Sequence, residues 1–246
     1  MILTSSQEAR IVGSEIAEHI AFGNIPSAYK KLSALLEDKN AFRLLDLIGE
    51  ALRSCPTAKL YPFLEMIAQG RSMGGWVVIA TALHSHSSAA PQEVLEKCHG
   101  FIMYADTWYA CDCFGERVPG PYLLTDFEKT VSLLSAWRYS PNPWVRRAVG
   151  VSIHFWAKRT KGAEDQLDNA NTLFAFIKPM LEEKEYQAAK GVGWGLKTLG
   201  RYYPHLAFEW LTEALIVEER RPLAIIRRKA LKYLPSEMKQ SLSRQS

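Results

Sequence analysis

Apolar side chains recur every three or four residues along almost the whole chain. This spacing places them on one face of an α-helix, and the alternating pattern bounded by Asn-Gly or Asp-Gly turns that marks β-hairpins is missing. The sequence therefore predicts an all-α protein. The expected helices cover residues 27–38, 41–54, 57–70, 74–86, 92–104, 107–115, 122–138, 143–159, 169–181, 186–202, 205–217 and 221–234.

Short polar or proline-containing breaks separate these helices, and some carry a start signal. Asn142 stands directly before Pro143, which places a capping side chain ahead of a proline at the first helical position. Asp106 is a similar candidate cap for the helix that follows it. Residues 116–121 and 160–171 are the clearest expected loops, and the second is long enough to be mobile.

A repeat emerges when the helical stretches are aligned with one another. Arg147 then falls on Lys190, 43 residues later, and the same register reaches Arg228 after 38 more. In the other direction, Asp112 precedes Arg147 by 35 residues and Gly75 precedes Asp112 by 37. These spacings are typical of HEAT-type helical pairs, which stack into a curved solenoid. An irregular helical bundle is the alternative.

The second helix of each pair lines the concave surface of a HEAT array. Asp112, Arg147, Lys190 and Arg228 would then project from successive inner helices onto one groove, with one acid among bases. A groove rich in Lys and Arg holds phosphates, and each contact adds affinity through counterion release. We therefore expect a single domain over residues 1–246, built of HEAT-like repeats stacked into a curved solenoid with a concave basic groove.

Composition is consistent with one folded domain and adds little about its partner. The chain has 246 residues, of which 48% are hydrophobic, so it can bury a sizeable core. Its net charge of +4 is compatible with nucleic acid without indicating it. The start lacks a basic region followed by a long apolar one, and the longest apolar run, 74–83, is far below the roughly 20 residues of a membrane span. We expect a cytoplasmic protein with no membrane contact.

Four cysteines invite a disulfide or metal interpretation. Cys55, Cys98, Cys111 and Cys113 show no disulfide framework, which fits a reducing compartment. Cys98, His99, Cys111 and Cys113 are candidate zinc ligands, but the Cys-x-Cys pair lies in an expected helix, where its sulfurs diverge. We expect buried thiols and neither a metal nor another cofactor.

Two expected helices each carry a Trp and a charged residue at i,i+4, which share one helix face. The first pair is Trp108 with Asp112, and the second is Lys190 with Trp194, followed by Lys197. The two pairs are alike in layout and opposite in charge. Flat aromatic faces, a carboxylate and several cations indicate a surface that handles positive charge beside a polyanion.

Three short stretches together resemble the bacterial DNA alkylation repair family, the AlkD-like HEAT-repeat glycosylases. Trp108-x-x-x-Asp112 is similar to its Trp-x-x-x-Asp element, and Trp144-Val-Arg-Arg147 to its Trp-Leu-x-Arg element. Lys190-Gly-Val-Gly-Trp194-Gly-Leu-Lys197 resembles its Lys-x-x-Gly-Trp-x-Leu-Arg segment. The likeness covers most of the chain and is strongest from about residue 100 to 215. Residues 72–79 depart from it, because they are nearly uncharged where the family places polar residues.

The resemblance implies base excision repair, by hydrolysis of the N-glycosidic bond of cationic alkylated purines, such as N3-alkyladenine and N7-alkylguanine, in duplex DNA. It implies that Asp112 stabilises the developing cation on the sugar and that the lesion stays largely stacked. Trp108 and Trp194 would offer π faces to the cationic nucleotide. The expected DNA-binding residues are Arg147, at the nearby phosphate, and Lys190, Lys197 and Arg228, the last three extrapolated from the repeat register.

Other interpretations stay open at this point. A Trp and an Asp at i,i+4 are more often a core aromatic and a solvated acid, and Arg147 is also a candidate for bridging two helices. We assign Trp137, Trp144, Trp156 and Trp210 to packing. The chain is alternatively an inactive relative that binds damaged or branched DNA, or a HEAT-repeat scaffold for protein interaction. We expect a monomer whose partner is double-stranded DNA with alkylated bases.

Overall fold

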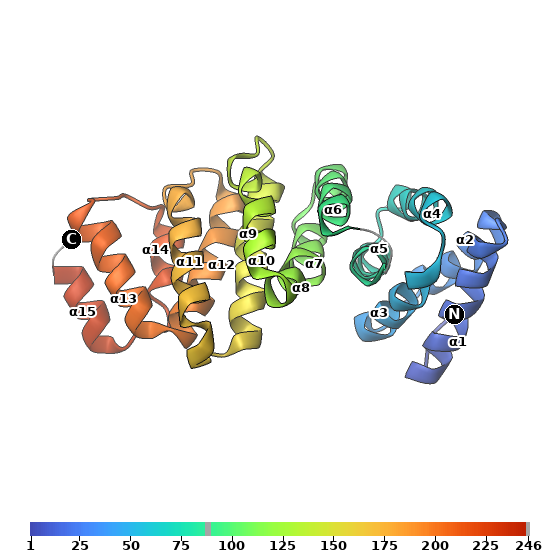
Figure 1. Cartoon of the computed structure of the whole chain (residues 1–246), viewed down its shortest axis with the longest axis horizontal. Coiled ribbons are helices and arrows are strands. Elements are labelled where there is room, and N and C mark those ends of the chain that lie inside the picture. Colours follow the sequence, from blue (N-terminus) through green and yellow to red (C-terminus); the bar gives the residue numbers. More distant parts are fainter. Residues whose placement is uncertain (87–89, 245–246) are drawn as a thin grey trace. The chain divides into compact units, whose positions relative to one another are not determined.

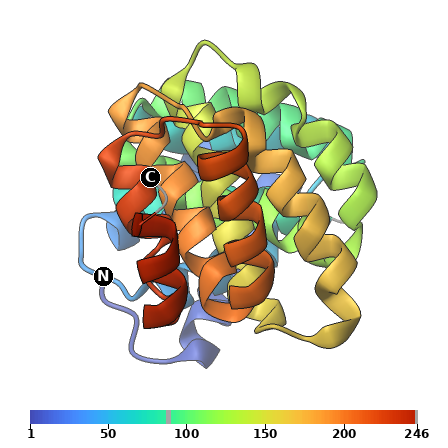
Figure 2. The same cartoon turned by 90° about the vertical axis from the view of Figure 1, so that its left-hand side faces the viewer.

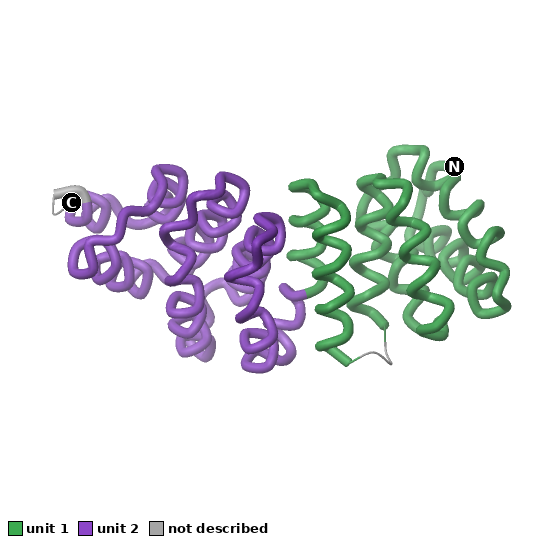
Figure 3. The backbone as a smooth tube through the Cα atoms, turned by 90° about the horizontal axis from the view of Figure 1, so that it is seen from above, with its two compact units in different colours: residues 1–118 green, residues 119–246 purple. Residues whose placement is uncertain are grey.

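The computed structural model describes residues 1–86 and 90–244, and all regular structure within these ranges is helical (Figure 1). The prediction of an all-α protein is confirmed. The chain divides into two compact units, Met1–Val118 and Pro119–Ser246 (Figure 3). The prediction of one continuous HEAT-like domain with a curved, basic concave face stays a prediction.

Unit 1 is built of two layers of helices. One layer is the succession α1, α3, α5 and α7, each packed on the next; α2 packs on α1 and α4, α4 on α5, and α6 on α5 and α7 (Figure 1). The helices of unit 1 are α1 (Ser6–Ala21), α2 (Ile25–Leu36), α3 (Phe42–Ala51), α4 (Thr57–Gln69), α5 (Met73–Ser85), α6 (Pro91–Ala105) and α7 (Trp108–Arg117).

Unit 2 repeats this arrangement. Its first layer is the succession α8, α10, α12 and α14, and α9, α11, α13 and α15 make up the other layer, whose last members lie toward the viewer in Figure 2. The helices of unit 2 are α8 (Pro119–Thr125), α9 (Phe127–Leu134), α10 (Pro143–Thr160), α11 (Leu167–Ile177), α12 (Tyr186–Tyr202), α13 (Pro204–Thr212), α14 (Ala224–Ala230) and α15 (Ser236–Arg244).

Helix α5 is buried almost all round, which explains the uncharged stretch at residues 72–79. Every residue from Gly75 to Leu83 is buried. Trp76 is 1% exposed and packs on Phe114 of α7, with ring centroids 5.9 Å apart. A helix that is apolar on all sides is one enclosed by neighbours, so this departure from the family pattern reflects the central place of α5 in unit 1.

Helices α10 and α12 touch backbone to backbone through glycines. A Cβ atom on Gly191 would lie 2.4 Å from the carbonyl oxygen of Arg147, and one on Gly150 would lie 2.1 Å from that of Gly191. On another side of α12, a Cβ on Gly193 would lie 2.9 Å from Cδ of Lys229 in α14. These contacts hold α12 between two neighbours, and they leave the face that carries Trp194 for other contacts.

Several predicted boundaries are wrong. The helix expected over 122–138 is interrupted at Asp126, where the backbone leaves the helical conformation (φ −147°, ψ 71°) between α8 and α9, and it ends in a 3-10 helix, Ala136–Tyr139. The loop expected over 116–121 is nearly absent: α7 continues to Arg117, and α8 begins at Pro119, whose missing N–H costs nothing in a first turn. The loop expected over 160–171 is shortened by a 3-10 turn, Glu164–Gln166, and by α11.

The two predicted caps differ in outcome. The Asn142 side chain accepts from the backbone N–H of Trp144 at 2.9 Å, which confirms its capping role at α10. The prediction for Asp106 is wrong, because the residue before α7 is Thr107. Asp106 instead ends α6 in the left-handed conformation (φ 48°), which Asp and Asn adopt more readily than most residues.

Neither a membrane span nor a metal site is present within residues 1–86 and 90–244. No helix there combines the length and apolar character needed to cross a bilayer. In the same part of the chain, no group of three His, Cys, Asp or Glu side chains is arranged to hold a metal ion. Burial raises the pKa of the Cys113 thiol to about 12, which keeps it protonated at neutral pH.

Candidate functional site

Helix α7 presents the predicted Trp108 and Asp112 on one face. Trp108, its first residue, is 55% exposed, and Asp112 follows one turn later, half-buried. The Trp108 ring meets the Tyr109 ring edge-on at 5.8 Å. On the opposite side of α7, the buried Phe114 stacks on Phe101 of α6 with centroids 6.0 Å apart. This packing fixes the helix and directs Trp108 outward.

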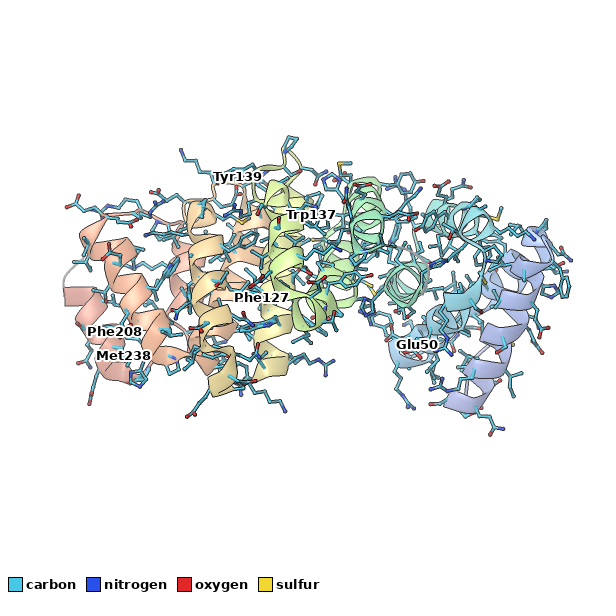
Figure 4. All side chains as sticks on the ribbon, in the orientation of Figure 1. Glu50, Phe127, Trp137, Tyr139, Phe208 and Met238 are labelled. Carbon is cyan, nitrogen blue, oxygen red and sulfur yellow. The ribbon has the colours of Figure 1, made fainter. Side chains whose placement is uncertain are left out.

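The exposure of Trp108 excludes the interpretation that it is a core aromatic. Large aromatic side chains are normally buried because they remove much apolar area from water. Two of the tryptophans assigned to packing are buried as expected: Trp137, beside α9 in Figure 4, is 6% exposed and Trp156 is 0% exposed. A π face and a carboxylate one turn apart both attract a cation.

Helix α12 carries a stripe of charged and aromatic side chains between its two glycine contacts. Lys190, Trp194, Lys197 and Arg201 are spaced i, i+4, i+7 and i+11, so they share one face. The Lys190 ammonium lies 4.7 Å from the centre of the Tyr186 ring. The structure thus brings together three predicted residues, Lys190, Trp194 and Lys197, and adds Arg201 to them.

A histidine that the sequence did not reveal holds Trp194. The His154 ring of α10 stacks on the Trp194 indole, with centroids 4.3 Å apart and planes at 26°. Its Nδ1 lies 2.7 Å from Oγ1 of Thr198, and that hydroxyl is 3.1 Å from the Trp194 carbonyl oxygen. When Thr198 donates to this carbonyl, Nδ1 of His154 is the donor to the hydroxyl. The position of the Trp194 indole is therefore fixed by His154 of the neighbouring helix α10.

His154 lies in a positive environment. Burial lowers the pKa of His154 to about 4, with further lowering by Lys158, Lys197 and Lys229. The imidazole is therefore neutral at neutral pH. His154 follows Arg147 by seven residues, so the sequence alone indicates that the two share one face of the same helix. That His154 stacks on Trp194 could not be predicted, because this contact depends on how α10 packs on α12.

Arg147 is more enclosed than expected of a phosphate contact. It is 6% exposed, and its Nη1 donates to the carbonyl and side-chain oxygens of Gln187 at 3.4 and 3.5 Å. The strong bridge between α10 and the segment before α12 comes from its neighbour: Nε and Nη2 of Arg146 donate to the Glu183 carboxylate at 2.6 and 3.1 Å. The two bonds from Arg147 to Gln187 are long by comparison, and their acceptors are neutral.

Arg228 is exposed on α14 beside Lys197. Both residues line one hollow in unit 2, of about 600 Å³. The predicted site residues thus fall into two sets: Trp108 and Asp112 belong to unit 1, and Arg147, Lys190, Trp194, Lys197 and Arg228 belong to unit 2. Their convergence on one groove stays a prediction.

Residues 1–86 and 90–244 are thus all-helical in their regular structure, with an exposed Trp108 beside a half-buried Asp112 in unit 1 and a cation-rich surface in unit 2. The family model described as DNA alkylation repair enzyme matches residues 77–234, more than half of the chain and all seven predicted site positions. The chain belongs to this family, so its work lies in DNA alkylation repair and its expected partner is DNA. The comparisons with curated proteins and with solved structures find no match.

Proposed function

We propose that the protein is a DNA glycosylase that hydrolyses the N-glycosidic bond of cationic alkylated purines in duplex DNA. N3-alkyladenine and N7-alkylguanine are the expected substrates. The observation that carries the proposal is Trp108, 55% exposed at the start of α7 and one turn from Asp112. The family match supports a role in repair, and the chemistry of this pair supports excision.

The reaction suits a carboxylate beside an aromatic face. An alkylated purine carries positive charge and leaves as a neutral base, so the charge moves onto the deoxyribose in the transition state. The Asp112 carboxylate stabilises this cation and orients or deprotonates the attacking water. The Trp108 ring adds cation–π attraction of about 0.5 to 2 kcal/mol, depending on desolvation.

The residues of unit 2 would bind the nucleotide and its phosphates. Trp194, held by His154, supplies a second π face. Arg147 takes a phosphate oxygen in place of its long bonds to Gln187, since a charged acceptor makes a stronger hydrogen bond than an amide. Further phosphate contacts come from Lys190, Lys197 and Arg228.

Replacement of Asp112 tests the proposal at the reacting group. Asp112→Asn keeps the shape of the side chain and removes its charge, so we expect DNA affinity to persist and base release to fall by about 100-fold or more. The measurement is single-turnover release of N7-methylguanine from methylated duplex DNA. Asp126→Asn, at an exposed acid of unit 2, is the matched control. Unchanged release by Asp112→Asn would place catalysis elsewhere.

A catalytically inactive relative that binds damaged or branched DNA is the second candidate. The cation-lined hollow at Lys197 and Arg228 favours it, because phosphate binding there needs neither Trp108 nor Asp112. This candidate predicts salt-sensitive DNA binding with base release no faster than the spontaneous rate.

A further inference from the structure

Helices α4 and α6 of unit 1 both pack on α5 (Figure 1), and a hollow of about 330 Å³ opens between them, called the α4/α6 hollow below. Its volume lies at the lower end of the range of about 300 to 1,000 Å³ that is typical of small-molecule sites. The residues that line it include Glu65 and Ala68 of α4 and Glu96, Gly100, Phe101 and Tyr104 of α6.

Gly100 is exposed in the interior of α6, where glycine is a poor helix former because it loses much backbone freedom on folding. Packing explains nine glycines of other α-helices, since an added Cβ would lie 2.1 to 3.3 Å from its nearest neighbour. These are Gly13, Gly49, Gly74, Gly75, Gly150, Gly191, Gly193, Gly195 and Gly200. At Gly100, no atom of residues 1–86 and 90–244 beyond its own turn lies within 4 Å of such a Cβ. A molecule that approaches the helix backbone through the hollow would explain this glycine.

The aromatic wall of the hollow is held by packing inside unit 1. Phe101 is 7% exposed and stacks on Phe114 of α7, with ring centroids 6.0 Å apart. Tyr104 meets the buried Trp76 of α5 edge-on at 6.5 Å, and the Arg71 guanidinium lies 4.7 Å from the centre of the Tyr104 ring. Tyr104 is nevertheless 44% exposed. A fixed and partly open aromatic wall suits a ligand with an apolar body.

Two carboxylates and one ammonium group line the hollow. Nζ of Lys97 lies 3.5 Å from the Glu65 carboxylate and 4.8 Å from the centre of the Tyr61 ring. The Glu96 carboxylate accepts from the neutral side-chain amide of Gln92 at 3.0 Å. The lining therefore has one negative charge in excess, which attracts a cation and repels an anion.

We propose that the α4/α6 hollow binds a small organic amine, that is, an aromatic or aliphatic body that carries an ammonium group. Glu96, Gly100 and Tyr104 are spaced four residues apart, so they share one face of α6. The apolar body lies over Gly100 against Tyr104, and the ammonium group pairs with Glu96. The proposal goes beyond DNA repair and depends on neither DNA binding nor base release, so it stands or fails separately from the proposed function.

Tryptamine, an indole ring with an ethylammonium group, is the probe. It is titrated into the isotope-labelled full-length chain, and binding is followed by amide NMR. We expect saturable shifts at Gly100 and Phe101. Indolepropionate carries the same ring with a negative charge, and we expect it to bind about fivefold or more weakly, because the excess negative charge of the hollow repels it.

Three variants test the ring position and the charge separately. Gly100→Leu fills the hollow, so we expect the affinity for tryptamine to fall by about tenfold or more. Its melting temperature should equal or exceed that of wild type, because the Cβ has room and leucine favours helix, and this separates blockage from misfolding. Glu96→Gln should weaken tryptamine binding by about two- to fivefold. Glu37→Gln, at an exposed acid that follows α2, is the matched control and should bind within about twofold of wild type.

The proposal is overturned if wild type shows no saturable shifts, if Gly100→Leu binds tryptamine as wild type does, or if indolepropionate binds as tightly as tryptamine. A helical peptide with one apolar face and a single Lys is tested in the same titration. Tighter binding of this peptide than of tryptamine, again blocked by Gly100→Leu, would overturn the small-molecule assignment and identify a docking site for a partner helix.

Discussion

Trp108 and Trp194 lie in different environments, although each is paired with a charged residue at i,i+4. Trp108 is exposed at the start of α7, and Trp194 is half-buried against the His154 ring. The i,i+4 rule indicates which side chains share a helix face. It gives no information about a ring from another helix, so His154 was missed, and only the packing of α10 on α12 reveals it.

The pKa of His154 makes a prediction about stability. Its folded value of about 4 lies below its ordinary value of 6.5, so the unfolded chain binds more protons between these pH values. The stabilisation is fully present above pH 6.5 and is lost as pH falls toward 4. His154→Gln cannot titrate, so we expect its melting temperature to fall less than that of wild type between pH 7.5 and 5.

Calorimetric melting of both proteins at the two pH values provides the measurement. The pKa values of His84 and His99 are also lowered by burial, but they contribute equally to wild type and variant. The difference between the two proteins therefore isolates His154 and the cations around it, Lys158, Lys197 and Lys229. Equal losses in melting temperature would contradict the account of this residue.

At the scale of elements, the contact between α10 and α12 depends on Gly191. A Cβ there would lie 2.4 Å from the Arg147 carbonyl oxygen, so Gly191→Ala forces the helices apart. We expect a loss of about 1 to 3 kcal/mol in unfolding free energy, because overpacking outweighs the better helix propensity of alanine.

Gly100→Ala is the matched control, since a Cβ at Gly100 of α6 meets nothing within 4 Å. It should be neutral or stabilising by about 0.5 to 1 kcal/mol. Urea denaturation followed by circular dichroism measures both variants. A Gly191→Ala protein as stable as Gly100→Ala would show that the close approach of α10 and α12 is unnecessary.

Most helices could be predicted, because a long segment with apolar residues at helical spacing is a strong sign of a helix. The residues at which the helices begin and end could not be predicted as well. Helix α1 was missed, although Ser5 accepts from the N–H of Glu8 at 3.1 Å and the Glu8 carboxylate accepts from the N–H of Thr4 at 2.7 Å. A Ser followed three residues later by Glu is a recognised helix start. The split between α8 and α9 was missed as well, because the apolar pattern continues through Asp126, although Asp is a residue type favoured at the N-cap position that Asp126 occupies before α9.

At the scale of the whole molecule, three short motifs, each weak alone, were enough to identify the family that the match over residues 77–234 confirms. The residues of these motifs belong to different units of the structure: Asp112 lies in unit 1, and Arg147 and Trp194 lie in unit 2. Sequence spacing indicates which helix of a repeat carries a residue. It does not determine how two units are oriented, and so the shared groove remains an inference from repeat register.

Binding of duplex DNA should depend strongly on salt. If the cations of unit 2 contact phosphates, the logarithm of the association constant falls linearly with the logarithm of salt concentration, by about 0.9 per phosphate neutralised. Fluorescence anisotropy between 50 and 200 mM salt measures the slope. Lys197→Gln should lower it by about 1. Absent or salt-insensitive binding would favour a scaffold for proteins over a DNA-binding role.

The most direct test of the central claim is release of modified bases by the wild-type chain. Purified protein is incubated with methylated duplex DNA, and the bases set free are separated and quantified over time. The account predicts release of N3-methyladenine and N7-methylguanine well above the spontaneous rate, with the sugar–phosphate backbone left intact. Release at the spontaneous rate, from a folded protein that binds the same DNA, would contradict it.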